Sequence, residues 1–171
     1  MNVVKPPFSW NFCPQCGSML IARDDGEHDR PYCQSCSRFY YFNPVPAACC
    51  FVPDGNKLLF VQRAVEPCKG MWTLPGGFVE LGETAEEGAL RELFEETNIV
   101  GRNTRLLGIS TQSSRQSGSV IILGFLVDDW EGSPVAQSDA SHVGFFPKEN
   151  RPPIAFQAHK DLLEIYDSLK P

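Results

Sequence analysis

The stretch "GGFVELGETAEEGALRELFEETNI", residues 76–99, decides the fold, because a glycine-rich loop runs directly into a glutamate-rich segment. Glu, Ala, Leu and Arg favour helices, and Thr84 followed by Glu87 has the spacing of a capping box, so a helix is predicted to begin at Thr84. Arg91 is the only cation of the stretch, although like charges three and four residues apart on a helix repel one another. Either the charge is ordinary solvation of a surface helix, or a positive partner binds there.

One face of this helix is predicted to carry Glu92, Glu95 and Glu96, because successive helical residues are rotated by about 100°. Leu90 and Leu93 lie on a neighbouring face that can pack against a sheet. Hard divalent cations such as Mg²⁺ prefer oxygen ligands, and a backbone carbonyl of the preceding Gly/Pro loop could join the carboxylates. A metal site is therefore the second interpretation of the acidic face, beside plain solvation.

Residues 77–99 resemble the Nudix box, G-x5-E-x7-R-E-U-x-E-E-x-G-U with U aliphatic, at every position but one. Asn98 stands where the pattern has glycine, and Asn is the next most tolerant residue for a left-handed helix end, so we expect this departure to be mild. The resemblance implies an α/β fold, the Nudix-type α/β/α sandwich with a mixed sheet. It also implies a pyrophosphohydrolase that acts on phosphorus-containing anhydrides with Mg²⁺ or Mn²⁺.

The resemblance assigns roles to the residues of the box. Glu95 and Glu96 would be the principal metal ligands, and Glu92 a further ligand or a base. Arg91 and Glu83 would orient the others through an ion pair that holds the helix to its preceding loop. The implied metal ligands are Gly76 through its carbonyl, Glu92, Glu95 and Glu96.

The general base is drawn from different places among members of the family, including a loop after the box. Here that loop, "VAQSDASHVGFF" (135–146), offers Asp139 and His142. His142 has the alternative of being a surface or partly packed histidine, and Asp139 that of a solvated loop residue.

Substrate contacts are predicted from three side chains. Arg63 at the end of a predicted strand and Arg115 in a loop could contact phosphates, although each could equally be solvated. Phe78 flanks the glycine loop and could stack on a ring, whereas core packing is expected for Trp72.

Two C-x-x-C pairs, Cys13-Pro-Gln-Cys16 and Cys33-Gln-Ser-Cys36, are separated by 16 residues. This spacing is typical of a four-cysteine structural zinc site. A segment of about 40 residues cannot bury enough apolar surface to fold on its own, and a bound metal would supply the missing stability. Redox-active dithiols and structural disulfides are the alternatives. Cys49 and Cys50 lie in an apolar run and are predicted to be small buried side chains.

A change in composition near "FNPVP" (42–46) places a domain boundary there, which gives a zinc ribbon at 1–43 and a Nudix domain at 44–171. After the boundary, strand-like runs flank the turn "PDGN" and are predicted to form a hairpin. The predicted elements are strands at 47–52, 57–63, 104–112 and 119–130, and a helix at 155–169.

The net charge of −6 argues against a general nucleic-acid or anionic-membrane surface. An apolar run long enough to span a membrane is absent, and "MNVVKPPFSW" lacks the apolar core of a secretory signal, so a cytoplasmic protein with reduced thiols is expected. No nucleic-acid or membrane partner is expected. Homodimers are common in the Nudix family, so the resemblance makes a homodimer a partner to test for.

A four-cysteine ribbon before a Nudix domain resembles the subgroup that includes NADH and FAD pyrophosphatases. The S-Q-P-W-P-F-P motif of the NADH enzymes is absent from the region "STQSSRQSGSVIILG", which favours FAD, ADP-ribose or a related dinucleotide. Two other hypotheses remain: a catalytically silent nucleotide-sensing domain, and a housecleaning nucleoside triphosphatase.

Overall fold

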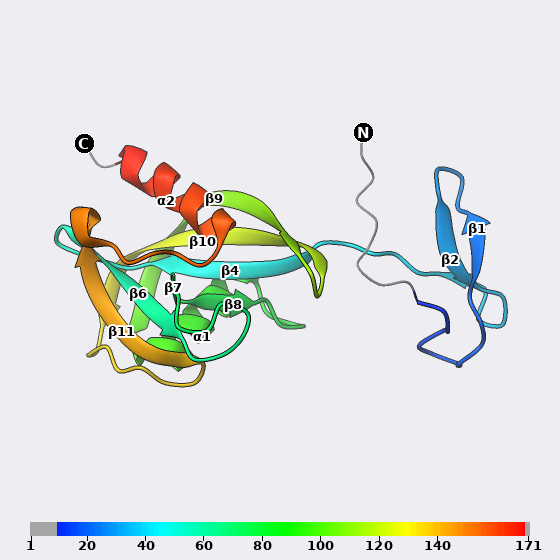
Figure 1. The fold of residues 1–171 in the computed structure, drawn as a ribbon, viewed down its shortest axis with the longest axis horizontal. Coiled ribbons are helices and arrows are strands. Elements are labelled where there is room, and N and C mark those ends of the chain that lie inside the picture. Colours follow the sequence, from blue (N-terminus) through cyan, green and yellow to red (C-terminus); the bar gives the residue numbers. More distant parts are fainter. Residues whose placement is uncertain (1–9, 170–171) are drawn as a thin grey trace. The chain divides into compact units, whose positions relative to one another are not determined.

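The computed structural model describes residues 10–169 and divides into two compact units (Figure 1). Among the described residues, one unit contains residues 10–44 together with Ser113–Ser119, and the other contains Val45–Gln112 and residues 120–169. Residues 1–9, in which the sequence predicts no secretory signal, lie outside the described part of the chain. The assignment of the two units as zinc ribbon and Nudix domain at residue 43 stays a prediction.

The first unit is a small antiparallel sheet in the order β1-β2-β3, formed by Ile21–Asp24, Asp29–Cys33 and Arg38–Phe39. Its aromatic and basic side chains stack at the surface, where the Arg23 guanidinium lies 4.4 Å from the centre of the Tyr32 ring. Within residues 10–44, only the cysteines Cys13 and Cys33 are fully buried. This sheet therefore has no apolar core of ordinary size.

The second unit contains two sheets. The first has the order β8-β4-β10-β9, in which β10 runs parallel to β4 and β8 runs antiparallel to it, so the sheet is mixed. The second has the order β11-β6-β5, with β7 also paired to β6. The strands are β4 (Val45–Phe51), β5 (Pro53–Asp54), β6 (Lys57–Arg63), β7 (Trp72–Thr73), β8 (Gly76–Phe78), β9 (Val100–Ser114), β10 (Gly118–Glu131) and β11 (Ala140–Pro147).

Two long helices, α1 (Ala85–Thr97) and α2 (Gln157–Leu169), cover opposite faces of these strands (Figure 1). Successive residues of a strand point to opposite faces, and β4 is apolar on both. Cys49 packs in the cluster that contains Leu162 of α2, whereas Cys50 packs in the cluster that contains Leu93 of α1. The fold is thus an α/β/α sandwich, as predicted. A short 3-10 helix, η1 (Lys148–Asn150), precedes α2.

The predicted hairpin around "PDGN" is present, but its first strand is shorter than predicted. The turn joins β6 to Pro53 and Asp54, and the Leu59 amide donates to the Val52 carbonyl at 3.1 Å. The rest of the predicted first strand lies in β4, which belongs to the other sheet and pairs there with β8 and β10.

The remaining predicted elements are confirmed. Strand β10 covers the run predicted at 119–130, its neighbour β9 covers 104–112, and α2 covers the predicted C-terminal helix. Cys49 and Cys50 are fully buried, as expected, and burial raises the pKa of both thiols.

Among the described residues, none of the helices is long and apolar enough to cross a membrane.

Candidate active site

Helix α1 is fixed at both ends by its own sequence. The Thr84 hydroxyl accepts a hydrogen bond from the Glu87 amide at 3.2 Å, and the Glu87 carboxylate accepts one from the Thr84 amide at 2.7 Å, so the predicted capping box is present. At the other end, Asn98 has φ 60°, and its amide donates to the Phe94 carbonyl. Asn98 therefore fills the left-handed role expected of the glycine in the Nudix pattern.

Arg91 is the hub of the acidic surface of α1. Its Nε and Nη2 donate to the two oxygens of Glu83 at 3.0 and 2.8 Å, which confirms the predicted ion pair. Its Nη1 donates to Glu92 at 2.9 Å and to Glu95 at 3.2 Å, and Nη2 also reaches the Phe78 carbonyl at 3.1 Å. The hydrogen bonds that Glu83 accepts from Arg91 and from the Glu80 amide lower its pKa to about 2. Arg91 thus ties the loop before the helix to the carboxylates on it.

Glu96 differs from its neighbours because it is buried, with 6% of its surface exposed. Its Oε2 accepts a hydrogen bond from the Gly76 amide at 2.9 Å. Burial raises the pKa of Glu96 to about 8, and the nearby charges of Glu92 and Asp139 act in the same direction. Burial also raises the pKa of Glu92, against the opposing effect of Arg91. A cation beside these carboxylates would favour their ionised forms.

Two glycines allow the β8 backbone to lie against these groups. Gly76 has φ 152°, and a Cβ there would come within 2.6 Å of the Cys49 Cα atom. A Cβ at Gly77 would come within 2.5 Å of the carboxyl carbon of Glu92. Neither position has room for a side chain, so the strand brings its backbone directly to the carboxylates.

The loop that leads to Gly76 is held from α2 by a buried histidine, which the sequence did not single out. The Thr73 hydroxyl lies 2.8 Å from Nδ1 of His159, and the Leu74 amide donates to the same nitrogen at 3.3 Å. Burial, with a smaller effect of the Arg63 charge, lowers the pKa of His159 to about 4. The neutral imidazole therefore acts as an acceptor that positions this loop.

The two predicted candidates for a general base have different surroundings. The Asp139 charge acts on both Glu92 and Glu96, so the structure brings Asp139 near the acidic face of α1. Its loop is tied to that helix, because the Gln137 amide donates to the Glu96 carbonyl at 3.1 Å. His142 instead lies exposed on β11, with Nδ1 3.4 Å from the Ser141 hydroxyl.

Of the predicted phosphate contacts, Arg63 lies in the same region as the carboxylates, because its charge acts on Glu96. Its Nε donates to the Pro67 carbonyl at 2.7 Å, and its guanidinium lies 5.1 Å from the centre of the Phe156 ring. Arg115 lies in the turn between β9 and β10. The structure therefore connects Arg63 with the acidic site.

The two aromatic side chains near the glycine loop have different environments. Phe78 is 47% exposed, which leaves its ring open to a ligand. Trp72 packs against the core beside Phe146, with ring centres 4.9 Å apart, as expected.

A second cluster is formed by the four N-terminal cysteines, whose sulfurs all lie within 4.8 Å of one another. The Cys13 and Cys36 sulfurs are 3.9 Å apart and those of Cys16 and Cys33 are 3.6 Å apart, too far for a disulfide bond. Tetrahedral zinc with Zn–S bonds of about 2.3 Å sets its sulfurs about 3.8 Å apart. The donor set and its spacing therefore fit zinc.

The protonation of these thiols also suits a cation. The pKa of Cys13 is lowered to about 6, because hydrogen bonds from Tyr40 and from backbone amides outweigh its burial. The pKa of Cys36 is raised to about 12, mainly by its hydrogen bond with Cys16. Cys13 therefore ionises more readily than Cys36, and a bound metal ion would favour the thiolate form of both.

The model of the NUDIX domain matches residues 43–165 of this chain. The chain belongs to the Nudix family. An ADP-ribose pyrophosphatase of Methanocaldococcus jannaschii is 38% identical over 74% of this chain and 75% of its own length. The NAD-capped RNA hydrolase NudC of Vibrio cholerae is 33% identical over 84% of this chain, which spans only 52% of that relative.

Solved structures of Nudix proteins have a similar fold. A Nudix hydrolase from Nitrosomonas europaea has a TM-score of 0.75 at 29% identity, with 94% of this chain and 92% of that chain covered. The Nudix domain of Shewanella oneidensis NrtR, solved with ADP ribose, has a TM-score of 0.67 at 25% identity, with 82% and 94% covered. This Nudix chain is accordingly an enzyme of the class that hydrolyses phosphorus anhydrides, and its Nudix helix is α1.

Proposed function

We propose that the protein is a metal-dependent hydrolase that cleaves the diphosphate linkage of ADP-ribose or a closely related nucleoside diphosphate derivative. The observation that carries this proposal is the buried Glu96 beside Glu92 and Glu95, held against the Gly76 backbone in a chain most of which resembles an ADP-ribose pyrophosphatase. The Nudix domain solved with ADP ribose supports the same substrate class. FAD and other dinucleotides remain within the proposed class.

The oxygen donors of the acidic site fit Mg²⁺ or Mn²⁺, and a cation beside the buried Glu96 would favour its ionised form. Glu92, Glu95, Glu96 and the Gly76 carbonyl would hold the metal. When bound, a divalent ion neutralises phosphate charge and acidifies a water molecule.

The chain's own residues would prepare the site for the reaction. Arg91 and Glu83 would fix the carboxylates in place, since Arg91 contacts Glu83, Glu92 and Glu95 at once. Asp139 or Glu92 would accept a proton from the attacking water, and Arg63 would contact a phosphate. Phe78 would stack on a ring of the substrate. His142 and Arg115 stay predictions without further support.

The balance of the reaction is simple. Water supplies a hydroxyl to one phosphorus of the P–O–P linkage, and the bond from that phosphorus to the bridging oxygen breaks. The other phosphate leaves with the bridging oxygen, so ADP-ribose would yield AMP and ribose 5-phosphate.

We also propose that Cys13, Cys16, Cys33 and Cys36 bind one structural Zn²⁺, which would replace the apolar core that residues 10–44 lack. Their sulfur spacing, close to that of a tetrahedral zinc site, supports this proposal.

The test is a hydrolysis screen of the full chain with Mg²⁺ or Mn²⁺ against ADP-ribose, FAD, NADH, diadenosine polyphosphates and nucleoside triphosphates. Glu95→Gln is the inactive blank, and Glu164→Gln, at an exposed glutamate of α2, is the matched control. We expect ADP-ribose or a dinucleotide such as FAD to be cleaved at its diphosphate linkage by the control variant but not by Glu95→Gln. Preferred release of pyrophosphate from nucleoside triphosphates would favour the housecleaning enzyme, and tight binding without turnover the sensing domain.

A further inference from the structure

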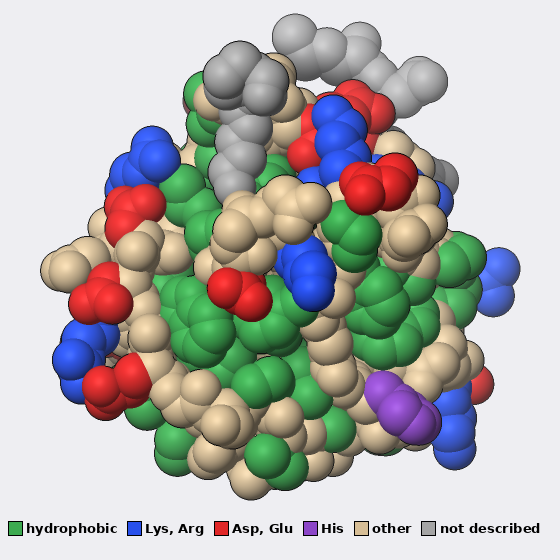
Figure 2. Space-filling model, turned by 90° about the vertical axis from the view of Figure 1, so that its left-hand side faces the viewer, with side chains coloured by type: hydrophobic (Ala, Val, Ile, Leu, Met, Phe, Trp, Pro, Cys, Tyr) green, Lys and Arg blue, Asp and Glu red, His purple; other side chains and the backbone are tan. Residues whose placement is uncertain are grey.

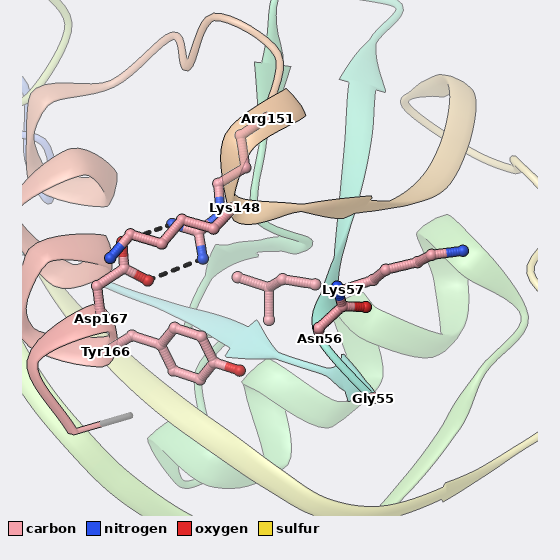
Figure 3. Close-up of a pocket in the computed structure, with 8 residues that line it drawn as sticks. Gly55, Asn56, Lys57, Lys148, Arg151, Tyr166 and Asp167 are labelled. Atoms are coloured by element: carbon pink, nitrogen blue, oxygen red, sulfur yellow. Dashed lines mark hydrogen bonds and ion pairs between the residues drawn. The ribbon is translucent and has the colours of Figure 1, made fainter. Parts of the chain in front are cut away.

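A cavity of about 410 Å³ lies at the Lys57 end of β6, the end opposite Arg63. Its walls are the turn 55–57, Leu58, Lys148, Arg151, Tyr166 and Asp167 (Figure 3). The volume falls in the range of small-molecule sites. Leu58 and Tyr166 belong to the apolar cluster under α2, whereas Leu93 of the Nudix helix belongs to the other cluster. The cavity is therefore separate from the acidic site.

The charged lining of this cavity has an excess of cations, although the whole chain carries a net charge of −6. Arg151 donates from Nη1 and Nη2 to the two oxygens of Asp167, both at 2.8 Å. Lys148 lies 3.5 Å from the same carboxylate. One carboxylate thus serves two cations, and Figure 3 shows Lys148 and Arg151 converging on it while the Lys57 ammonium points away.

Arg151 has unused hydrogen-bonding capacity. Its side chain is only 15% exposed, and its Nε is buried with no hydrogen-bond partner among the described residues. Nη1 and Nη2 each carry a second N–H beside the one given to Asp167, and a ligand oxygen can accept from it. Lys148 is 67% exposed, so its ammonium is free to turn toward a ligand at the rim.

The apolar part of the lining gives the cavity a second character. Leu58 forms a wall inside it, and the Tyr166 ring lies opposite Arg151 with its hydroxyl toward the Gly55–Asn56 turn (Figure 3). The view of this end of the molecule in Figure 2 likewise shows basic and acidic side chains among patches of hydrophobic ones. A cationic group beside an apolar wall suits an anion attached to an organic body, not a bare metal or a neutral lipid.

We propose that this cavity binds a small phosphate monoester, with its phosphate between Lys148 and Arg151 and its organic body against Leu58 and Tyr166. A phosphate monoester offers three terminal oxygens, enough to accept from the Lys148 ammonium and from both outer nitrogens of Arg151 together. A carboxylate offers only two. The site is additional to the proposed hydrolase and does not depend on that activity.

The test is isothermal titration of the full chain with AMP and with inorganic phosphate, in buffer without added divalent metal. The protein carries Glu95→Gln, which removes a proposed metal ligand of the acidic site, and any AMP binding that remains there should not depend on Lys148. Lys148→Gln is compared on this background with Lys160→Gln, which removes an exposed lysine of α2 that does not line the cavity. Thermal denaturation checks that both variants fold. Lys148 is exposed, so its replacement should not disturb the fold, and Arg151→Lys serves as a second variant of the cavity.

We expect AMP to bind more tightly than inorganic phosphate, and Lys148→Gln to weaken AMP binding by about tenfold or more while Lys160→Gln leaves it unchanged. Equal binding by Lys148→Gln and Lys160→Gln would overturn the proposal, as would the absence of binding by either probe. Inorganic phosphate binding as tightly as AMP would overturn the assignment of Leu58 and Tyr166 to an organic body. None of these outcomes bears on hydrolysis, so failure here leaves the proposed function intact.

Discussion

Replacing Gly77 by alanine would displace one carboxylate of the acidic site without changing any charge. The new Cβ would lie 2.5 Å from the carboxyl carbon of Glu92 and 2.9 Å from its Oε2, whereas ordinary van der Waals contacts begin near 3.4 Å. The Glu92 carboxylate would therefore have to move by about 1 Å, and its 2.9 Å hydrogen bond from Arg91 would be strained or lost. A misplacement of about 1 Å in an active site can cost about a hundredfold in rate.

The fold should tolerate this change, because the obstructing atoms are the end of a flexible side chain. Alanine also restricts the unfolded chain, which contributes about 0.4–1 kcal/mol of stability where the backbone permits it. Gly76→Ala is the matched contrast, since its Cβ would meet the backbone of Cys49 at 2.6 Å and the residue has φ 152°. We expect Gly76→Ala to lose stability, and Gly77→Ala to keep it.

The assay is ADP-ribose hydrolysis as a function of Mg²⁺ concentration, with urea denaturation of each variant. For Gly77→Ala we expect kcat to fall by about a hundredfold with a free energy of unfolding within about 1 kcal/mol of the parent. Wild-type turnover by Gly77→Ala would refute the reasoning, because it would mean that the position of Glu92 is unimportant. A large loss of stability would refute the claim that only a side chain must move.

Three further predictions follow from single contacts. Arg91→Lys cannot reproduce the two-pronged contact with Glu83, so activity should fall by at least about tenfold and the free energy of unfolding by about 1–2 kcal/mol, as measured by kcat and urea denaturation; unchanged values would contradict the hub role. Cys13→Ser should lower the zinc content measured by elemental analysis and destabilise the first unit, whereas one zinc per chain in the variant would disprove the ribbon. His159 has a pKa of about 4 in the folded protein, against an ordinary value near 6.5. Neutral His159 therefore stabilises the fold fully above pH 6.5, and the free energy of unfolding falls by about 3 kcal/mol as the pH drops from about 6.5 to about 4. His159→Asn keeps an acceptor but does not titrate, so its urea-denaturation stability should lack this decline, and parallel pH curves would contradict the assignment.

The sequence predicts the Nudix helix well because its signals are local. Thr84 and Glu87 cap each other, and Asn98 ends the helix, within a few residues of chain. The ion pair between Arg91 and Glu83 spans only eight residues and follows from the same pattern. Short-range geometry of this kind is largely determined by residue type and spacing.

The burial of Glu96 was not predicted, although the helix carries a signal for it. Ala89, Leu93 and Glu96 have the i, i+4, i+7 spacing of one face, and the first two are fully buried. A glutamate at the third position of an otherwise apolar stripe is therefore a candidate for burial. Glu96 thus lies on the edge between the acidic face and the apolar face of α1.

Contacts between distant segments were predicted less well. The sequence places β4 and β6 on either side of a turn, but the choice of β8 and β10 as partners of β4 depends on the whole sheet. His159 lies 85 residues from the Leu74 amide that donates to it, and no local pattern connects the two. The cavity around Arg151 likewise combines a turn, η1 and α2.

The central claim is that the acidic face of α1 holds the divalent metal that the hydrolysis requires. The most direct measurement is the rate of ADP-ribose hydrolysis across a titration of Mg²⁺, with wild type, Glu95→Gln and the control Glu164→Gln measured side by side. We expect saturable dependence on Mg²⁺ for wild type and the control, and loss of nearly all turnover in Glu95→Gln. Turnover without added divalent metal, or wild-type activity in Glu95→Gln, would contradict it.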